Sequence, residues 1–397
     1  MEKVNALVLV ANPGSASRKY ALYDGPRLLM KVHFEYEGDQ IVYSCQSPQG
    51  SSKTEPAGVG DLSVVATKIF DIFVALGLLT SKDQVETIGL RVVAPSSYFQ
   101  VDRVLNASAE NALDKLRHRS ALHIEALLKE SDTLRQIFPE ATLVAVSDSA
   151  FHASMPATAR HYAINTNDAK NLDVYRFGYH GLSVESAIRK LVALGKLPSR
   201  SIICHLGSGA SITAVKNGKS VDCSMGYSPL EGLMMATRSG DIDITAAQVL
   251  QAGLGLDDHQ LHEYLGRRSG LLGVSGRSSD IRELLKDEQA GHEPAGLALD
   301  MYVYRTQQAI GKMTASLGGL EALIFTGTVG ERSAEMRRRI IKNLAFLGLS
   351  LDPHLNHTPT PVSKPARLSP IAHPVKIYVV PADEDAVIAT HARKLVS

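Results

Sequence analysis

The chain has 397 residues, 44% of them hydrophobic and 21% charged, the balance of an ordinary globular protein with room for two or three domains. Its formal net charge is +1 and no strongly basic or acidic block stands out, which argues against a nucleic-acid or membrane-surface role. No apolar stretch approaches the roughly 20 residues that span a bilayer, and three cysteines without a CxxC pair are typical of free thiols in a reducing cytoplasm.

The N-terminal segment predicts a strand, a polar loop and two further strands. Leu7–Ala11 is a short apolar run that predicts the first strand, and the polar loop Asn12–Lys19 ends it. Tyr20–Tyr23 predicts a second strand, Asp24-Gly25 supplies a turn, and Leu28–Glu37 alternates as a third strand would. The first apolar run is too short for the core of a signal peptide, so we expect a cytoplasmic protein.

Helices and strands then alternate up to residue 150. Apolar residues at helical spacing predict a helix over Asp61–Leu78 and one or two helices over Ala107–Lys129. Thr87–Val93 and Leu143–Val146 are predicted strands. The second of these delivers Asp148 at its carboxyl end, where α/β sheets usually place chemistry.

The segment from Ser201 to Asp243 is the most informative part of the chain. It predicts a buried strand at Ile202–Cys204, a Gly/Ser loop at Leu206–Ser211, and a hairpin closed by Asn217-Gly218. A glycine-rich turn after a strand can aim backbone N–H groups at an anion such as phosphate. The N-terminus has the same plan, which predicts two related domains that each offer a loop to one phosphate chain. The alternative is that two unrelated β-meanders share the pattern.

The C-terminal part continues the alternation, so the fold class is α/β. Helices are predicted over Thr245–Ala252 and Ala295–Leu317, strands over Leu323–Thr326 and Val375–Val380, and irregular structure over Pro353–Pro374. The basic run Arg337–Arg339 is expected to be the solvated face of a helix. Asp383-Glu384-Asp385 is expected to open the terminal helix, since acidic side chains suit a helix N-terminus.

Nearly the whole chain resembles the acetate kinase family. The matching segments are Asn12–Lys19, Ser147–His152, Tyr175–Ser183, His205–Ser211, Ser224–Met235, Thr237–Asp241, Gly270–Glu283 and Phe325–Glu331. The stretch Pro229–Asp241 is the most specific. The resemblance implies the duplicated actin-like α/β fold that is shared with Hsp70 and sugar kinases, with a cleft between two domains. The implied domains are 1–150 plus 384–397, and a nucleotide-binding domain over 151–383.

The resemblance also implies a reaction, the transfer of a phosphoryl group between ATP and a short carboxylate with Mg²⁺ present. Two anions must then be held in line while charge on the moving group is neutralised. Arginine suits this task because its guanidinium is permanently charged and its planar fork of N–H donors matches a carboxylate or a phosphate.

Four residues match the family's catalytic set. Arg91 and Arg238 match its two active-site arginines. His180 matches the histidine that stabilises the transferring group, and Asp148 matches the active-site acid. The alternatives are surface ion pairs for the arginines, a structural role for the histidine, and a helix-capping or loop-bracing role for Asp148. Instead of acting as a base, Asp148 could also only orient Arg91 or the metal shell, since a carboxylate nucleophile needs no deprotonation near neutral pH.

The other implied site residues bind the substrates. The carboxylate pocket is implied at Arg91, Val93, Leu122, Tyr179 and Pro229. Nucleotide contacts are implied at Ser15, Ser17, Lys19, His205, Gly207, Ser208, Gly209, Asp280, Arg282, Gly327, Gly330 and Glu331. Mg²⁺ is implied at Asn12 and Glu384, a sparse set that suits an ion which keeps several waters. The alternatives are a strand-end role for His205 and a helix-capping role for Glu384.

The chain departs from the family pattern at the rims of both pockets. The changed positions are Ala94-Pro95-Ser96, Ile124-Glu125 and Tyr179 near the acid, and Ser208, Arg277, Thr328 and Arg332 near the nucleotide. Because both rims have changed, the substrates stay open. Acetate is the default acid, with propionate or butyrate as alternatives. ATP is the default phosphoryl donor, with pyrophosphate as the alternative. A nucleotide-binding protein without transferase activity is the alternative from another class. A homodimer is expected from the family.

Overall fold

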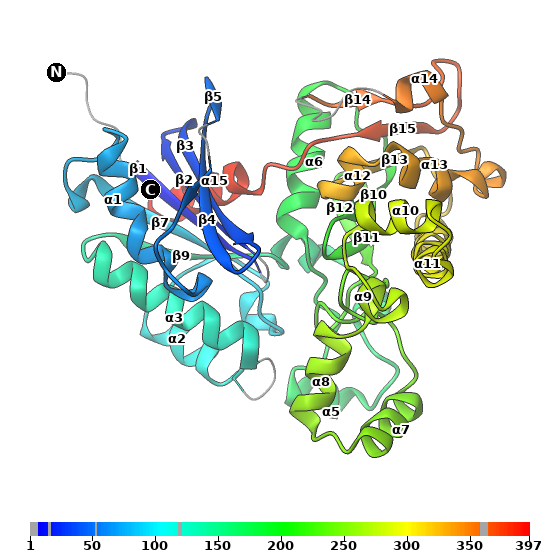
Figure 1. Cartoon of the computed structure of the whole chain (residues 1–397), viewed down its shortest axis with the longest axis horizontal. Helices are drawn as coiled ribbons and strands as arrows, with labels where there is room; N and C mark the ends of the chain where they lie inside the picture. The colour runs from blue at the N-terminus through cyan, green and yellow to red at the C-terminus, as the bar shows by residue number, and fades with distance from the viewer. Residues whose placement is uncertain (1–6, 15–16, 52–53, 118–120, 358–363) are drawn as a thin grey trace. The chain divides into compact units, whose positions relative to one another are not determined.

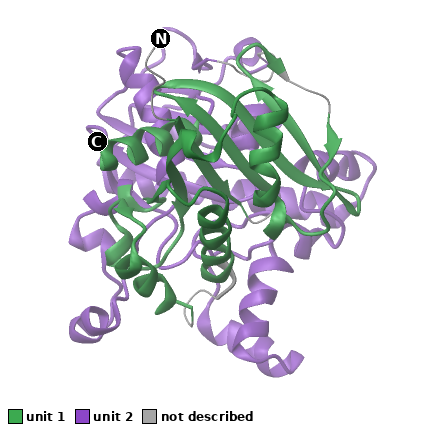
Figure 2. Cartoon of the chain, turned by 90° about the vertical axis from the view of Figure 1, so that its left-hand side faces the viewer, with its two compact units in different colours: residues 1–150, 383–397 green, residues 151–382 purple. Residues whose placement is uncertain are grey.

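The computed structural model describes residues 7–14, 17–51, 54–117, 121–357 and 364–397, without the side chains of residues 51 and 121–123. The chain separates into two compact units, shown in Figure 2. Unit 1 consists of residues 1–150 and 383–397, and unit 2 consists of residues 151–382. Unit 1 is therefore assembled from two stretches that lie at opposite ends of the sequence.

Unit 1 is built on one mixed sheet (Figure 1). Its strands are β1 (Leu7–Pro13), β2 (Ser17–Asp24), β3 (Arg27–Glu37), β4 (Gln40–Ser47), β5 (Gly50–Ser51), β6 (Glu55–Pro56), β7 (Val85–Val92), β8 (Arg103–Val104) and β9 (Thr142–Ser147). They are ordered β5-β4-β3-β2-β1-β7-β9-β8, with β6 beside β4. β1, β7 and β9 are parallel, whereas β1, β2 and β3 pair antiparallel, as the strand–turn–strand pattern predicts.

Helices cover both faces of the unit 1 sheet. They are η1 (Leu62–Lys68), α1 (Ile69–Ala75), η2 (Lys82–Gln84), η3 (Ser97–Phe99), α2 (Ala107–Asp114), α3 (Ala121–Ile137) and α15 (Glu384–Val396). Alternate residues Leu7, Leu9 and Ala11 of β1 enter a core that η1, α1, α2 and α3 complete. The opposite face carries α15, which packs on β1, β7 and β9.

One glycine allows that close packing. A Cβ at Gly89 of β7 would come within 2.8 Å of Ile388 Cγ2 and 3.0 Å of Ala392 Cβ, both on α15. Glycine in a strand interior often marks such a close approach. The C-terminal helix is therefore fitted to β7 at this position.

Unit 2 repeats the central strand arrangement of unit 1. Its strands are β10 (Arg200–Leu206), β11 (Ala210–Lys216), β12 (Lys219–Cys223), β13 (Ala322–Thr326), β14 (Ala366–Arg367) and β15 (Lys376–Val379). They are ordered β12-β11-β10-β13-β15-β14. β10, β13 and β15 are parallel, and β10, β11 and β12 pair antiparallel. The order β3-β2-β1-β7-β9 thus recurs as β12-β11-β10-β13-β15, which confirms the predicted duplicated actin-like α/β fold.

Helices also cover both faces of the unit 2 sheet. They are η4 (Ala150–Ser154, which begins at the last residue of unit 1), α4 (Ala157–Arg160), α5 (Thr166–Leu172), α6 (Gly181–Ala193), α7 (Ile244–Leu254), α8 (Asp258–Arg267), α9 (Gly270–Ser275), α10 (Ile281–Gln289), α11 (Glu293–Leu317), α12 (Gly327–Arg332), α13 (Ala334–Lys342), η5 (Ala345–Leu347) and α14 (Pro353–Asn356). α6 packs on β10 and β13, and the long α11 packs on β10, β11 and β12 (Figure 1). Across the described ranges, no helix has the length and apolar character needed to cross a membrane.

Three local predictions need correction. The helix predicted over Asp61–Leu78 is a 3-10 run followed by the short α1. The region Pro353–Pro374 is not wholly irregular, because it contains α14 and β14. The expected solvated face at Arg337–Arg339 is wrong for Arg337, whose side chain is buried because α13 turns it towards α12 and α14.

Candidate active site

Three predicted residues of unit 1 lie at the carboxyl ends of neighbouring parallel strands. Asn12 is near the end of β1, Arg91 near the end of β7, and Asp148 directly after β9. The Asp148 N–H donates to the Val92 carbonyl at 2.9 Å, which continues the strand pairing by one residue. Parallel strands end at the same edge of a sheet, so the fold brings these side chains together.

Arg91 is held by three acceptors. Its Nη2 donates to Asp148 Oδ2 at 2.9 Å and its Nη1 to Asn12 Oδ1 at 3.2 Å. Nη1 also lies 3.5 Å from Glu384 Oε2. Burial by itself would lower the pKa of Arg91, but the carboxylates of Asp148 and Glu384 outweigh it and raise that pKa. The guanidinium therefore stays charged and fixed in direction.

The start of α15 completes this cluster. Asn12 Nδ2 donates to Glu384 Oε2 at 3.0 Å and to Asp385 Oδ1 at 3.2 Å. Lys31 of β3 lies 3.0 Å from Asp385 and 2.8 Å from Asp383. Burial acts to lower the pKa of Lys31, but the two carboxylates raise it overall. The sequence prediction missed Lys31 and Asp385; the three consecutive acidic residues were the signal that could have suggested Asp385.

The donor set of this cluster fits a magnesium ion that has few protein ligands. Asn12 and Glu384, the two residues predicted to bind the ion, lie together in this cluster and carry oxygen atoms, which Mg²⁺ prefers as ligands. In the part of the chain that the structure describes, no three His, Cys, Asp or Glu side chains are arranged to hold a metal. An ion here would take its remaining ligands from water or phosphate, as Mg²⁺ commonly does.

The other predicted residues of unit 1 lie around the same strands. Ser17 and Lys19 are on β2, where Ser17 offers its carbonyl to the Gly14 N–H at 2.9 Å and Lys19 is exposed. Val93 directly follows β7 and is partly buried. Ser15 and the side chain of Leu122 lie outside the described residues.

In unit 2 two predicted histidines stack on each other beside the glycine loop. The rings of His180 and His205 are 4.2 Å apart between centroids. His180 Nδ1 lies 3.0 Å from Ser211 Oγ, and His205 Nδ1 lies 2.7 Å from Ser183 Oγ. These serines, which the sequence prediction missed, fix the ring orientations. His180 has a φ of 61° immediately before α6, a left-handed conformation that is uncommon outside glycine and often found at functional sites.

The loop between β10 and β11 lies against these rings. A Cβ on Gly209 would come within 3.0 Å of His180 Nε2, so glycine allows the loop backbone to approach the imidazole. The loop is tight, because the Gly207 N–H donates to the Gly209 carbonyl at 2.9 Å, and the Ser208 carbonyl accepts from Ala236 N–H at 3.1 Å. The latter bond joins it to the segment that carries Arg238.

The side chain of Arg238 extends to the glycine loop beside His180. Its Nη1 donates to the Pro229 carbonyl at 3.3 Å and lies 3.7 Å from the position of a Cβ on Gly209. Its backbone is packed closely, since a Cβ on Gly270 would be 2.8 Å from both the N and the O of Arg238. The structure thus gathers His180, the glycine loop, Pro229 and Arg238 in one place.

A second network, which the sequence prediction missed, braces the Pro229 segment. Glu231 accepts from Tyr162 Oη and lies 3.2 Å from Arg176 Nε. Burial is the main cause that raises the pKa of Tyr162, and the hydrogen bond to Glu231 adds to it. The predicted Tyr179 donates its hydroxyl to the Tyr227 carbonyl at 2.6 Å. These contacts hold the turn that presents Pro229.

The predicted nucleotide residues further along the chain fall into two groups. Glu331 Oε1 accepts from the N–H groups of Gly327 and Ala382, both at 2.9 Å, so it braces its own loop. That loop lies beside the glycine loop, because a Cβ on Gly207 would be 3.8 Å from Thr328 N. Gly330 is buried in α12, the same short helix.

Asp280 and Arg282 form the second group at the start of α10. They pair with each other at 2.5 Å, and Asp280 also caps the helix through the Arg282 N–H. The hydrogen bond from Arg282 lowers the pKa of Asp280, against a smaller opposing effect of burial.

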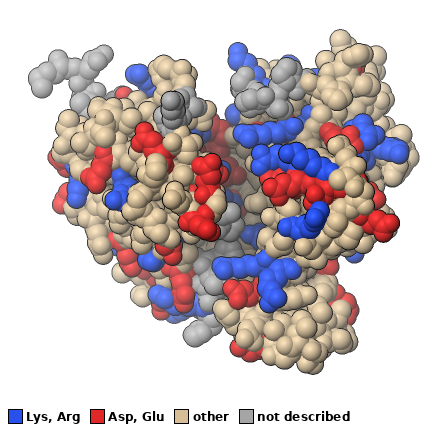
Figure 3. All heavy atoms as spheres, in the orientation of Figure 1, with Lys and Arg blue, Asp and Glu red and all other residues tan. Residues whose placement is uncertain are grey.

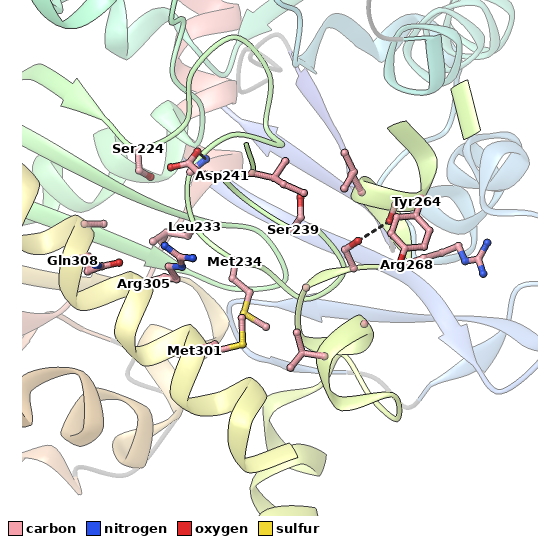
Figure 4. Close-up of a pocket in the computed structure, with 18 of the residues that line it drawn as sticks. Ser224, Leu233, Met234, Ser239, Asp241, Tyr264, Arg268, Met301, Arg305 and Gln308 are labelled. Atoms are coloured by element: carbon pink, nitrogen blue, oxygen red, sulfur yellow. Dashed lines mark hydrogen bonds between the residues drawn. The ribbon is translucent and has the colours of Figure 1, made fainter. Parts of the chain in front are cut away.

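A separate cavity of about 650 Å³ is lined in part by Ser239 and Asp241, which follow Arg238 in the sequence (Figure 4). Leu233, Met234, Ser239 and Asp241 line it from the loop, and α11 contributes residues such as Met301. None of the predicted site residues is among the described residues that line it. The cavity is therefore lined by neighbours of Arg238 in the sequence, such as Ser239, and is distinct from the group formed by His180, Pro229 and the glycine loop.

Comparison with known proteins identifies close relatives over the full described fold. The profile of the Acetokinase family matches residues 7–390. An acetate kinase from Bacteroides thetaiotaomicron is 35% identical over 391 residues, covering 96% of this chain and 98% of that protein. A propionate kinase from Edwardsiella piscicida is 36% identical over 392 residues, covering 98% and 96%. The crystal structure of Porphyromonas gingivalis acetate kinase superposes with a TM-score of 0.85 at 32% identity, covering 99% of this chain and 100% of that one.

Proposed function

Because the chain belongs to the Acetokinase family, we propose that it is an Mg²⁺-dependent kinase that transfers a phosphoryl group between ATP and acetate or another short carboxylate. When ATP phosphorylates acetate, the products are acetyl phosphate and ADP. The observation that carries the proposal is the grouping of His180, Arg238 and Pro229 around the glycine loop. Such a set of donors and a permanent cation suits the charge of a transferring phosphoryl group.

In the proposed reaction Arg91 holds the carboxylate substrate. One carboxylate oxygen attacks the γ-phosphorus in line, a new O–P bond forms, and the bond to the ADP oxygen breaks. Arg238 and His180 stabilise the equatorial oxygens of the moving group. A carboxylate nucleophile is already ionised near neutral pH, so no base is needed. The 2.9 Å pair between Asp148 and Arg91 supports a positioning role for Asp148.

Magnesium would be held by the cluster at Asn12 and Glu384. When bound with the nucleotide, the ion supplies charge neutralisation at the phosphate oxygens. The test is Glu384→Ala, which should raise the Mg²⁺ concentration needed for the half-maximal rate. Glu86→Ala, which removes an exposed carboxylate from β7, is the matched control. An unchanged Mg²⁺ requirement in Glu384→Ala would mean that Glu384 only stabilises the N-terminus of α15.

The decisive experiment traps acyl phosphate with hydroxylamine while the acid and the donor are varied. Acetate, propionate and butyrate are each tested with ATP, GTP and pyrophosphate. We expect product with ATP. Nucleotide binding without acyl phosphate for any acid would instead indicate a nucleotide-binding protein that lacks transferase activity.

The acid pocket is expected to accept more than acetate. Two observations support this expectation. The rim is altered at Ala94-Pro95-Ser96 and Ile124-Glu125, and a propionate kinase is among the relatives. A methylene changes discrimination by only about 10–200-fold in a hydrophobic pocket, so propionate should be a measurable substrate. Rejection of propionate by more than about 200-fold relative to acetate would contradict this.

The phosphoryl donor is assigned as ATP on family grounds. Thr328 and Arg332 change the loop beside the glycine loop, and they could narrow the space for a base or stack on it. Turnover with pyrophosphate alone would overturn the ATP assignment and leave the fold and the transfer chemistry in place.

We also infer a cytoplasmic homodimer. Cys45, Cys204 and Cys223 are buried and are not joined in disulfides, which suits a reducing compartment. Exposed apolar side chains on α7 and α11 support self-association, notably Ile244, 74% exposed, and Val249, 66% exposed.

A further inference from the structure

Arg337 of α13 is among the most deeply buried large side chains, with 1% of its surface exposed. Its Nη1 donates to the Gly330 carbonyl at 2.8 Å and to the Glu331 carbonyl at 2.9 Å. On its other side Nε donates to Asn356 Oδ1 at 2.9 Å and Nη2 to the Asn356 carbonyl at 2.8 Å. One guanidinium thus joins the end of α12 to α14.

The acceptors of Arg337 are all neutral in these four bonds. No described carboxylate forms an ion pair with it, whereas the neighbours Arg338 and Arg339 pair with Glu335. Burial lowers the pKa of Arg337 to about 10, which still leaves it protonated near neutral pH. A buried charge without a countercharge is normally unfavourable. An apolar residue could fill the same space, but it could not donate to the three backbone carbonyls that Arg337 binds.

The segment that Arg337 binds carries three of the predicted nucleotide contacts, Gly327, Gly330 and Glu331. Gly327 starts this loop with a φ of 78°, and a Cβ there would come within 2.7 Å of the Leu206 carbonyl. The Glu331 carboxylate accepts from the Gly327 N–H and so ties the end of the loop to its beginning. Arg337 then holds the two carbonyls at the end. The backbone of 327–331 is fixed at both ends and lies beside the glycine loop.

We propose that Arg337 is a positioning residue for the nucleotide, which acts by holding the backbone of 327–331 in its binding conformation. This inference rests on the proposed kinase function and deepens it. Arginine is suited to the task because its fork presents several N–H donors in a fixed plane, which reach the loop and Asn356 together. Lysine has one rotating head group and cannot keep both sets of contacts.

The test compares Arg337→Lys and Arg337→Met with Arg338→Met. The last is the matched control, because it removes an arginine from the same helix that lies on its exposed side. For each variant one measures kcat, the KM for ATP, the KM for the carboxylate, direct ADP binding by calorimetry, and thermal unfolding. Asn356→Ala is the milder second variant. It removes the side-chain oxygen that accepts from Arg337 Nε and leaves the bonds from Arg337 to the Gly330 and Glu331 carbonyls in place.

The expected result is a selective loss of nucleotide affinity. In the Arg337 variants the KM for ATP and the dissociation constant of ADP should rise roughly tenfold or more. The KM for the carboxylate should stay within about twofold, because a displaced loop weakens the binding only of the nucleotide that it contacts. Asn356→Ala should shift in the same direction by less, and Arg338→Met should resemble the wild type.

Two outcomes would overturn the inference. One is a folded Arg337→Lys with unchanged ADP binding. The other is a parallel rise in both KM values, which indicates a general structural role. If neither Arg337 variant folds, Asn356→Ala decides by the same split between the two KM values. A wild-type protein that fails to bind ADP would instead contradict the proposed function itself.

Discussion

Arg91 and Arg238 are each held in place by the chain before any substrate binds. Arg91 is paired with Asp148, and Arg238 donates to the Pro229 carbonyl. Side chains that are fixed in this way lose little freedom when the reaction begins, which is what electrostatic preorganisation requires.

The first prediction concerns these two arginines. Arg91→Ala and Arg238→Ala should each lower turnover on the order of 10³-fold, the scale of an arginine that stabilises a phosphoryl transition state. The measurement is kcat for acetyl phosphate formation, with circular dichroism to verify folding. Near-normal rates in a folded variant would remove that arginine from the mechanism.

The local motif around each side chain was sufficient to select Asn12, Arg91 and Asp148, and the parallel strand ends explain why they meet. Their roles remain predictions. Lys31 could not be selected in the same way, because its contact with Asp385 joins residues more than 300 positions apart and no motif around Lys31 encodes it. Arg337 was misjudged because a run of three arginines gives no sign of which one α13 turns inward.

At the scale of elements, α15 carries Glu384 and rests on β7 at Gly89. The second prediction is that Gly89→Ala destabilises unit 1 by about 1–3 kcal/mol, because the added methyl overlaps Ile388 and Ala392. It should also raise the Mg²⁺ requirement, since α15 must shift. Thermal unfolding and Mg²⁺ titration measure the two effects.

Gly60→Ala is the control for this prediction, since a Cβ there meets no atom within 4 Å. An unaltered melting temperature in Gly89→Ala would show that α15 adjusts freely and is not fitted to the strand.

The third prediction concerns the surface of α10 and α13, where basic and acidic side chains alternate (Figure 3). Hydrogen bonds from Arg338, opposed by burial and assisted by Arg339, lower the pKa of Glu335 to about 2. A depressed carboxyl pKa stabilises the folded state above the ordinary value of 4.5, and this contribution is lost as pH falls through about 2.

The stability difference between wild type and Glu335→Gln should therefore be full above about pH 4.5 and shrink on acidification. Denaturant unfolding at a series of pH values measures it. Because the pairs are partly exposed, added salt should reduce the difference. A difference independent of pH would mean that the pairs add no stability.

The hairpins show which elements can be predicted from local chemistry. Asn217 and Gly218 adopt φ values of 50° and 77°, the conformation that their residue types favour, and β11 and β12 pair around them as expected. The short α14 and β14 were missed because prolines predict irregular structure, although Pro353 occupies the first position of α14, where its lack of an N–H is harmless.

For the whole molecule, the repeated strand–loop–strand–turn–strand pattern predicted two related domains, and its three strands pair antiparallel in each sheet. The fourth prediction concerns assembly. Ile244→Asp and Val249→Asp should convert a homodimer into monomers, because each places a charge at an exposed apolar position of α7. Light scattering coupled to size-exclusion chromatography gives the mass.

Ile371→Asp is the control for assembly, since Ile371 is 87% exposed and lies outside α7 and α11. Dimers that persist in both α7 variants would place the subunit contact elsewhere, and a monomeric wild type would contradict the homodimer.

The position of α15 in the sequence has a consequence for biosynthesis. The ribosome makes residues 151–382 before it makes this helix, yet the helix covers β1, β7 and β9, which were made first. Unit 2 can fold as soon as it emerges, whereas the earlier-made sheet waits with one apolar face uncovered. A nascent chain stalled before residue 384 should therefore recruit chaperones through its oldest segment, and release of the last residues should end that dependence.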